Sequence, residues 1–280
     1  MRNIILFILL MIIISVGQLS AQAQESRERP YRLGVSLGNS FTGYREETYS
    51  PLNMYLNTIT FIVDGNIEKG NLLHSLNIGF FTGNPETKNQ PIAVMLKYID
   101  HQTGEAYYFA NAYFRYDNVI RVYIEYALDY RLWGNNIFPG YLGGMFRTDM
   151  YMQFANYPSI TGIISLGFHG TQKWIINQEN HFTLSLGIPF FGYTLRPPYA
   201  GADAAIMKYA EESPLRLLTL GNVVSLHNYW ALFGDLKYHH KINQLLSLYS
   251  GLGLEFSHIN IPRPRKDAIL RLNAGIAFTF

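Results

Sequence analysis

The 280-residue chain contains no cysteine, which excludes disulfide bonds, thiol catalysis and lipid attachment to an N-terminal cysteine. Its net charge is only +2, and no basic run is interleaved with aromatic residues, which argues against nucleic-acid binding. The sequence also lacks a Walker loop, a G-x-G-x-x-G motif after a strand, and the G-x-S-x-G and H-E-x-x-H motifs. We therefore expect no cofactor and no metal site.

Long apolar runs are also scarce, although hydrophobic residues make up 48% of the chain. The single long run, from Ile4 to Val16, follows a positively charged start and precedes Ala21-Gln22-Ala23, a small-residue A-x-A site. This run is shorter than the ~20 residues that a membrane-spanning helix needs. We expect a secretory signal peptide over residues 1–23 and one exported domain over residues 24–280. An uncleaved membrane anchor is the alternative.

Period-two alternation is the dominant pattern in the rest of the chain. In segment 119–133 one face carries Ile120, Val122, Ile124, Tyr126, Leu128, Tyr130 and Leu132. The other face carries Arg121, Tyr123, Glu125, Ala127, Asp129, Arg131 and Trp133. A helix cannot separate these residues in this way, because its period is near 3.6. The first face suits lipid, and the second suits a polar lumen.

The same alternation recurs in other parts of the chain and predicts the fold class. Clear segments are 141–154, 160–176, 181–195, 228–242, 245–259 and 268–280, and weaker ones are 31–42, 52–65, 71–83, 91–100 and 105–117. Together they predict an all-β fold, an antiparallel transmembrane β-barrel of about twelve strands. A soluble, secreted β-sandwich would not need apolar stripes on nearly every strand. An even strand number places both termini on the periplasmic side.

The C-terminal segment ends on an aromatic residue and contains a recognisable pattern. Asn273, Gly275, Phe278 and Phe280 occupy the polar, glycine, hydrophobic and terminal aromatic positions of an eight-residue motif. This ending resembles the C-terminal assembly signal of bacterial outer-membrane β-barrel proteins. The resemblance implies an outer-membrane location, and it implies that the barrel-assembly machinery binds the last strand.

The connections between segments are predicted by counting back from the C-terminus. Short periplasmic turns are expected at 68–70, 102–104, 134–140, 177–180 and 243–244. External connections are expected at 43–51, 84–90, 117–118, 156–159, 197–227 and 260–267. The long external loop 197–227 opens with Arg196-Pro197-Pro198, which ends the preceding strand. It is interpreted either as a lid or lumen plug or as a plain surface loop.

Charged residues of both signs alternate onto the predicted lumen face. The expected lumen-lining residues are Arg115, Arg121, Glu125, Asp129, Arg131, Arg147, Asp149, Lys173, Asp235, Lys237, Glu255 and Arg271. In a water-filled pore such residues set the selectivity for solutes. In a small closed barrel they pair with one another and fill the interior. Because about twelve strands lie between the filled eight-stranded and the open sixteen-stranded case, we expect a narrow or partly plugged lumen.

One histidine raises the question of catalysis. Some outer-membrane barrels are lipid hydrolases with serine and histidine at the outer rim, and His258 follows Ser257 near the external end of a strand. Neighbouring side chains in a strand point to opposite faces, so Ser257 cannot readily reach His258. The hydrolase motif requires serine two residues after histidine, where this chain has Asn260. His258 is therefore a weak catalytic candidate, and His169 and His239 lack metal-ligand spacing.

These observations lead to one leading functional hypothesis and one alternative. We predict a monomeric outer-membrane barrel that is a narrow or partly plugged solute channel or a structural envelope protein. The alternative is an outer-leaflet hydrolase that acts on lipid A or phospholipids. Membrane lipids and lipopolysaccharide are the expected partners, and the basic loop 262–267 either contacts lipopolysaccharide headgroups or is simply a solvated loop.

Overall fold

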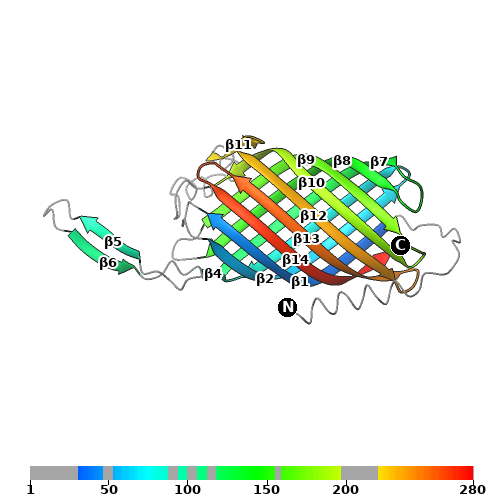
Figure 1. The fold of residues 1–280 in the computed structure, drawn as a ribbon, viewed down its shortest axis with the longest axis horizontal. Helices are drawn as coiled ribbons and strands as arrows, with labels where there is room; N and C mark the ends of the chain where they lie inside the picture. Colours follow the sequence, from blue (N-terminus) through cyan, green and yellow to red (C-terminus); the bar gives the residue numbers. More distant parts are fainter. Residues whose placement is uncertain are drawn as a thin grey trace, which may run out of the picture.

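Ten long antiparallel strands form a closed barrel (Figure 1). The computed structural model describes residues 31–46, 53–87, 94–99, 106–111, 118–154, 159–196 and 220–279. The barrel strands are β1 (Tyr31–Glu46), β2 (Met54–Lys69), β3 (Leu72–Gly83), β7 (Asn118–Trp133), β8 (Gly140–Phe154), β9 (Ser159–Ile175), β10 (Asn180–Leu195), β12 (Tyr229–Lys241), β13 (Leu246–Ile259) and β14 (Arg265–Thr279). No helix among these residues is long and apolar enough to cross a membrane.

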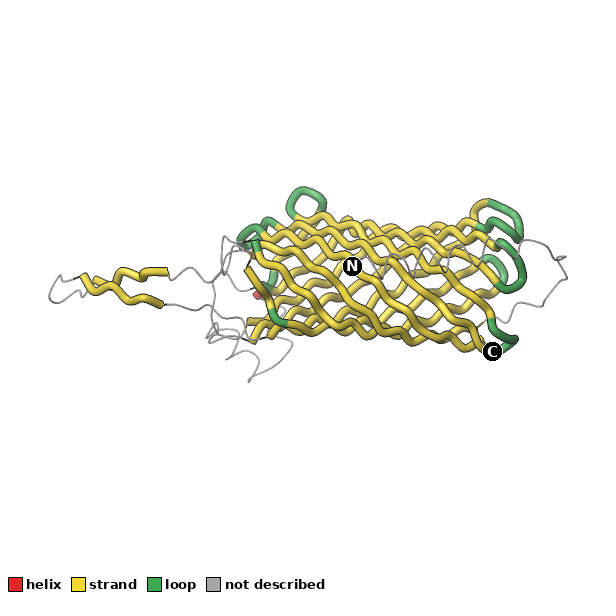
Figure 2. The backbone as a smooth tube through the Cα atoms, turned by 60° about the horizontal axis from the view of Figure 1, so that its bottom comes forward, coloured by secondary structure: helices red, strands yellow, loops and turns green. Residues whose placement is uncertain are grey.

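Strand β1 closes the barrel. It pairs antiparallel with β14 on one side and with β2 on the other. Its register with β14 runs from Arg32 opposite Thr279 to Glu46 opposite Arg265. Closure leaves no open sheet edge along the wall, and the tilted strands surround the whole circumference in Figure 2. The prediction of an all-β, antiparallel, closed barrel is confirmed.

The predicted count of about twelve strands needs a correction. Segments 91–100 and 105–117 do not enter the wall, because β3 pairs directly with β7. They contain β5 (Val94–Ile99) and β6 (Ala106–Asn111), which pair with each other in a separate two-stranded sheet, drawn apart from the barrel in Figure 1. Each has six residues, fewer than the ~9–11 that a tilted spanning strand needs. Alternation alone does not reveal this difference in length.

The connections fall at two ends of the barrel. The first residue of β1, the last residue of β14 and the connections 70–71, 134–139, 176–179 and 242–245 lie at what we call the terminal end. Asparagine side chains cap three of these connections: Oδ1 of Asn135, Asn177 and Asn243 accepts hydrogen bonds from backbone N–H groups two and three residues further on. The sequence predicted turns at these places. The predicted turn at 102–104 lies outside the described residues.

The opposite end, which we call the loop end, carries the remaining connections. Two short strands extend the wall there: β4 (Pro85–Thr87) pairs with β2, and β11 (Asn222–Ser225) pairs with β10. The predicted turn at 117–118 is not a tight hairpin, because β7 begins at Asn118 and its predecessor in the wall is β3. Most of the predicted long loop, residues 197–219, lies outside the described residues.

The two faces of the wall follow the predicted alternation. In β7 the even-numbered residues from Ile124 to Leu132 are exposed on the outside, while Arg121, Tyr123 and Asp129 are buried inside. The same alternation holds in β13, where Leu252, Leu254 and Phe256 are exposed and Glu255 is buried. The outside is therefore an apolar belt, and the inside holds the charges.

This arrangement makes a depth-dependent prediction for the outer face. Leu252 lies midway along β13 and points outward, so Leu252→Arg should lower the free energy of unfolding by about 2–4 kcal/mol in lipid vesicles. Leu246→Arg is the matched control, because it changes the same face of the same strand at the terminal end. Leu246→Arg should lower the free energy of unfolding by only about 0–1 kcal/mol. Denaturant unfolding in vesicles measures both, and equal losses would contradict the placement of the belt.

Candidate functional site

The structure places the predicted lumen residues on the inner face of the wall, with one exception that it does not describe. Arg115 lies outside the described residues. Those placed inside are Arg121, Glu125, Asp129, Arg131, Arg147, Asp149, Lys173, Asp235, Lys237, Glu255 and Arg271. They do not form one group. Some form a connected layer across the middle of the barrel, and others lie between this layer and the terminal end.

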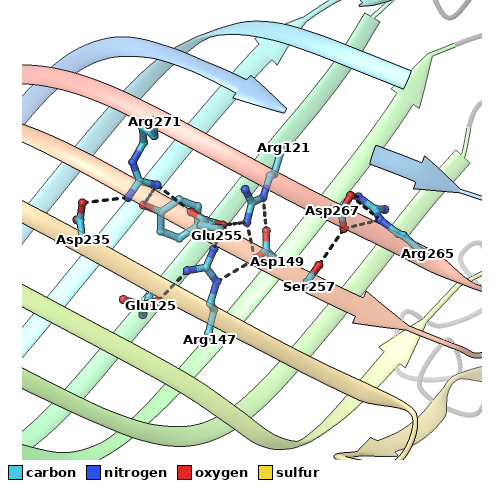
Figure 3. Close-up of polar contacts among 11 residues, drawn as sticks. Arg121, Glu125, Arg147, Asp149, Asp235, Glu255, Ser257, Arg265, Asp267 and Arg271 are labelled. Carbon is cyan, nitrogen blue, oxygen red and sulfur yellow. Dashed lines mark hydrogen bonds and ion pairs between the residues drawn. The ribbon is translucent and has the colours of Figure 1, made fainter. Parts of the chain in front are cut away.

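Glu255 is the centre of the layer (Figure 3). Its Oε2 accepts hydrogen bonds from Arg121 at 2.6 Å and Arg147 at 2.9 Å. Its Oε1 accepts one from Arg271 at 2.9 Å. One buried carboxylate thus binds three buried guanidinium groups, each through a charge-assisted hydrogen bond.

Three further carboxylates balance these arginines. Asp149 accepts hydrogen bonds from Nε of Arg121 at 2.6 Å and from Nε of Arg147 at 2.9 Å. Glu125 binds Arg147 at 2.7 Å, and Asp235 lies 3.4 Å from Arg271. We call these seven side chains the ion-pair layer: Arg121, Glu125, Arg147, Asp149, Asp235, Glu255 and Arg271. Every member has a partner of opposite charge, and Lys237, which lies 3.6 Å from Asp235, offsets the excess of four carboxylates over three arginines.

The layer crosses the full width of the barrel. Arg121 is on β7 and Glu255 is on β13, and these strands are five positions apart in either direction around the wall. Their contact therefore joins diametrically opposite strands. Aromatic rings fill the space between the charges: Arg147 lies over Phe233 at 3.8 Å and over Tyr123 at 4.3 Å.

The lumen between the layer and the loop end is filled. Tyr44, Met54, Leu56 and Val119 form one buried apolar cluster there. A second cluster contains Ala127, Met145, Ile163, Val224, Tyr229, Ala231, Phe233 and Ile259. It extends from the loop end past the layer, because Ala127 and Met145 lie on the terminal-end side of Glu125 and Arg147 along β7 and β8. Arg265 binds Asp267 at 2.9 Å and stacks on Tyr151 at 3.8 Å. A void of about 10 Å³ remains beside Arg121 and Tyr151, which is room for about one water molecule.

The lumen between the layer and the terminal end is open. A cavity of about 790 Å³ extends from Tyr123, Arg147 and Glu255 to residues of the terminal-end turns, including Asn136 and Gln178. The described residues therefore enclose a deep cavity whose inner end is the ion-pair layer.

Paired charges and polar groups also form the cavity wall. Lys237 of β12 binds Asp64 of β2 at 2.6 Å. Lys173 of β9 binds Glu68 of β2, which also accepts a hydrogen bond from Tyr141. Asp64 and Glu68 were not among the predicted lumen residues. Their positions could have been found in the sequence, because both have the same parity as Thr58 and Thr60 on β2.

Histidines inside the barrel have structural partners. His169 Nδ1 lies 2.7 Å from the buried carboxylate of Asp129. His181 and His239 stack with their ring centroids 4.5 Å apart, and Arg32 lies 3.0 Å from His239 Nε2. Within the described parts of the chain, no group of three or more His, Cys, Asp or Glu side chains could hold a metal ion.

The weak catalytic candidate, His258, lies on the outside of the barrel. Its ring is next to Trp230, with centroids 6.1 Å apart. Ser257 points to the inside and donates a hydrogen bond to Asp267 at 2.9 Å. The two side chains are therefore separated by the wall, and the structure does not bring Ser257 to His258.

Comparisons with known proteins support the fold. No protein-family model and no curated protein matches the chain. The outer membrane protease OmpT from Escherichia coli is structurally similar, with a TM-score of 0.53 and 8% identity over 93% of this chain and 100% of that chain. The translocator domain of the autotransporter NalP from Neisseria meningitidis scores 0.39, with 10% identity over 96% of this chain and 92% of that chain. The chain has the fold of a bacterial outer-membrane β-barrel, and at 8% identity the similarity to OmpT extends to the fold alone.

The central position of Glu255 makes a stability prediction. Glu255→Gln removes the charge that Arg121, Arg147 and Arg271 share, so that Arg121 keeps Asp149 and Arg271 keeps Asp235 as its one ion-pair partner among the described residues. The free energy of unfolding should fall by about 3–5 kcal/mol. Glu125→Gln is the control, because Arg147 keeps Asp149 and Glu255. Denaturant titration in vesicles should show a clearly smaller loss for the control, and similar losses would contradict the central role of Glu255.

Proposed function

We propose that the protein is a sealed outer-membrane barrel, a structural envelope protein rather than an open channel. The observation that carries this proposal is the ion-pair layer, which joins opposite strands through Arg121 and Glu255. The packing of the described side chains on the loop-end side supports it, since the void beside Arg121 and Tyr151 measures about 10 Å³. The apolar outer belt and the fold shared with OmpT support the membrane location.

Orientation is part of the proposal. The terminal end faces the periplasm and the loop end faces outward, as the even number of strands favours. The cavity of about 790 Å³ then opens towards the periplasm. Small polar molecules of the periplasm can enter it from that side, but the ion-pair layer stops them halfway.

Gated passage of a small solute is the second candidate function. The cavity favours it, because a purely structural barrel could fill its lumen throughout. In the described residues, the seal also consists of side chains and not of backbone. Side chains can change rotamers, so the seal could open. The hydrolase alternative has less support, because Ser257 and His258 lie on opposite faces of the wall.

Conductance in planar bilayers tests the seal. The unmodified barrel should give no steady current steps, whereas Arg147→Ser, Tyr151→Ser and Glu255→Ser together should produce them. The two charge changes cancel, Arg121 keeps Asp149 and Arg271 keeps Asp235, so the folded barrel should survive. Lys173→Ser is the control and should stay silent, because Lys173 lies on the cavity wall and not in the ion-pair layer.

Each outcome of the conductance measurement has a clear meaning. Steady steps from the unmodified barrel would contradict a sealed lumen. Brief openings that appear only when a particular solute is added would favour gated passage. A heat-dependent shift in gel mobility checks that every variant is folded before its current is recorded.

Orientation can be tested cleanly because the chain has no cysteine of its own. Arg263 is exposed in the loop-end connection after β13, and Gln244 is exposed in a terminal-end turn. On intact cells, a membrane-impermeant maleimide should label Arg263→Cys and not Gln244→Cys. Both variants should react after the outer membrane is permeabilised. The reverse pattern would overturn the proposed orientation.

A further inference from the structure

The outer face of the barrel carries very few charges. Among the outward positions that the structure describes on the ten strands, none is Asp or Glu, and Arg45, Lys69 and Lys266 are the only Lys or Arg residues. Lys69 is alone near the terminal end. The other two are direct cross-strand neighbours near the loop end.

Arg45 and Lys266 belong to a row of four cross-strand neighbours. Arg45 of β1 is opposite Lys266 of β14, Lys266 is opposite His258 of β13, and His258 is opposite Trp230 of β12. We call these four side chains the basic row. Trp230 is 49% exposed, and tryptophan is typical of the membrane–water interface.

The basic row lacks internal charge compensation at its centre. Like charges directly opposite each other destabilise a sheet. Lys266 is exposed and has no ion-pair partner among the described residues, and its cross-strand neighbours are Arg45 and His258. In addition, Nδ1 of His258 is buried and has no hydrogen-bond partner within the described structure. An anion placed against the row would give Lys266 the partner of opposite charge that it lacks among the described residues, next to the ring of His258.

An open apolar surface lies directly below the row, towards the middle of the barrel. Gly43 of β1 and Ala268 of β14 are opposite each other, with Tyr55 on one side and Phe256 on the other. Tyr55 and Phe256 are 47% and 41% exposed. A Cβ atom on Gly43 would meet only Tyr55, at 4.0 Å. The two small residues therefore leave room for an acyl chain between two aromatic side chains.

We propose that the basic row binds the phosphates of an anionic glycolipid of the outer leaflet, with an acyl chain lying over Gly43 and Ala268. Ammonium and guanidinium groups form strong charge-assisted hydrogen bonds to phosphate. The proposal rests on the proposed orientation, which places the loop end in the outer leaflet.

The width of the basic row favours a headgroup with more than one phosphate. Arg45, Lys266 and His258 lie on three successive strands, which spans about 10 Å at the usual strand spacing. A lipid A headgroup with two phosphates can contact both ends of this span at once. A phospholipid with a single phosphate contacts only part of it.

Native mass spectrometry of the folded protein in detergent tests the proposal with three probes: bisphosphorylated lipid A, phosphatidylglycerol and phosphatidylethanolamine. Lys266→Gln and Arg45→Gln should each weaken lipid A binding about fivefold, the effect of about 1 kcal/mol per basic residue at an anionic surface. Gly43→Leu should also weaken it without changing any charge. Lys69→Gln is the matched control, since Lys69 is an outward lysine near the other end, and it should leave binding unchanged.

Several results would overturn the proposal. An equal loss in Lys69→Gln would mean that lipid A responds to overall charge and not to the basic row. Equally tight binding of phosphatidylglycerol would remove the preference for a glycolipid. Absence of lipid A binding to a barrel that is folded and correctly labelled at Arg263→Cys would refute the site but leave the sealed barrel intact. Labelling only from the periplasmic side would instead overturn the orientation on which the site depends.

Discussion

The closed hydrogen-bonded ring of strands is the constraint on which the rest of the structure depends. Because β1 pairs with both β14 and β2, the wall has no open edge, and its backbone groups find partners without water. A closed wall has only an outside and an inside, so each strand must divide its side chains between lipid and lumen. The charged residues that alternate with leucine and phenylalanine are therefore mostly directed into one narrow space.

That narrow space determines what the charges do. Ten strands enclose a lumen only slightly wider than the one that eight strands fill with side chains. Arginines that would line a wide pore as separate groups instead reach acids on the opposite wall, as Arg121 reaches Glu255. Removing one partner of such a buried pair costs much more than the pair itself contributes to stability. The lumen charges are thus linked to one another, and the seal and the stability of the barrel have the same origin.

The sequence predicts the faces of the wall well and the number of strands less well. Alternation assigns Ile124 and Arg121 to opposite faces, because side-chain direction is a local property of a strand. Whether a strand joins the wall depends on its partners. The β5 and β6 segments alternate as wall strands do, but they pair with each other outside the wall. The contacts of Glu255 also could not be predicted from the sequence. They depend on which strands face each other across the lumen, and this follows only once the number of strands is known.

The two ends of the barrel differ in a way that connects the inside with the outside. Towards the loop end the lumen is packed, with Tyr151 and Arg265 buried beyond the ion-pair layer. Towards the terminal end the wall surrounds a large polar cavity. A packed lumen supports the wall from within, so the outward side chains near the loop end are held in a fixed register. The basic row needs this rigidity, because Arg45, Lys266 and His258 can act on one headgroup only if their three strands keep their relative positions. The packing that closes the lumen therefore also fixes the surface that we propose for lipid binding.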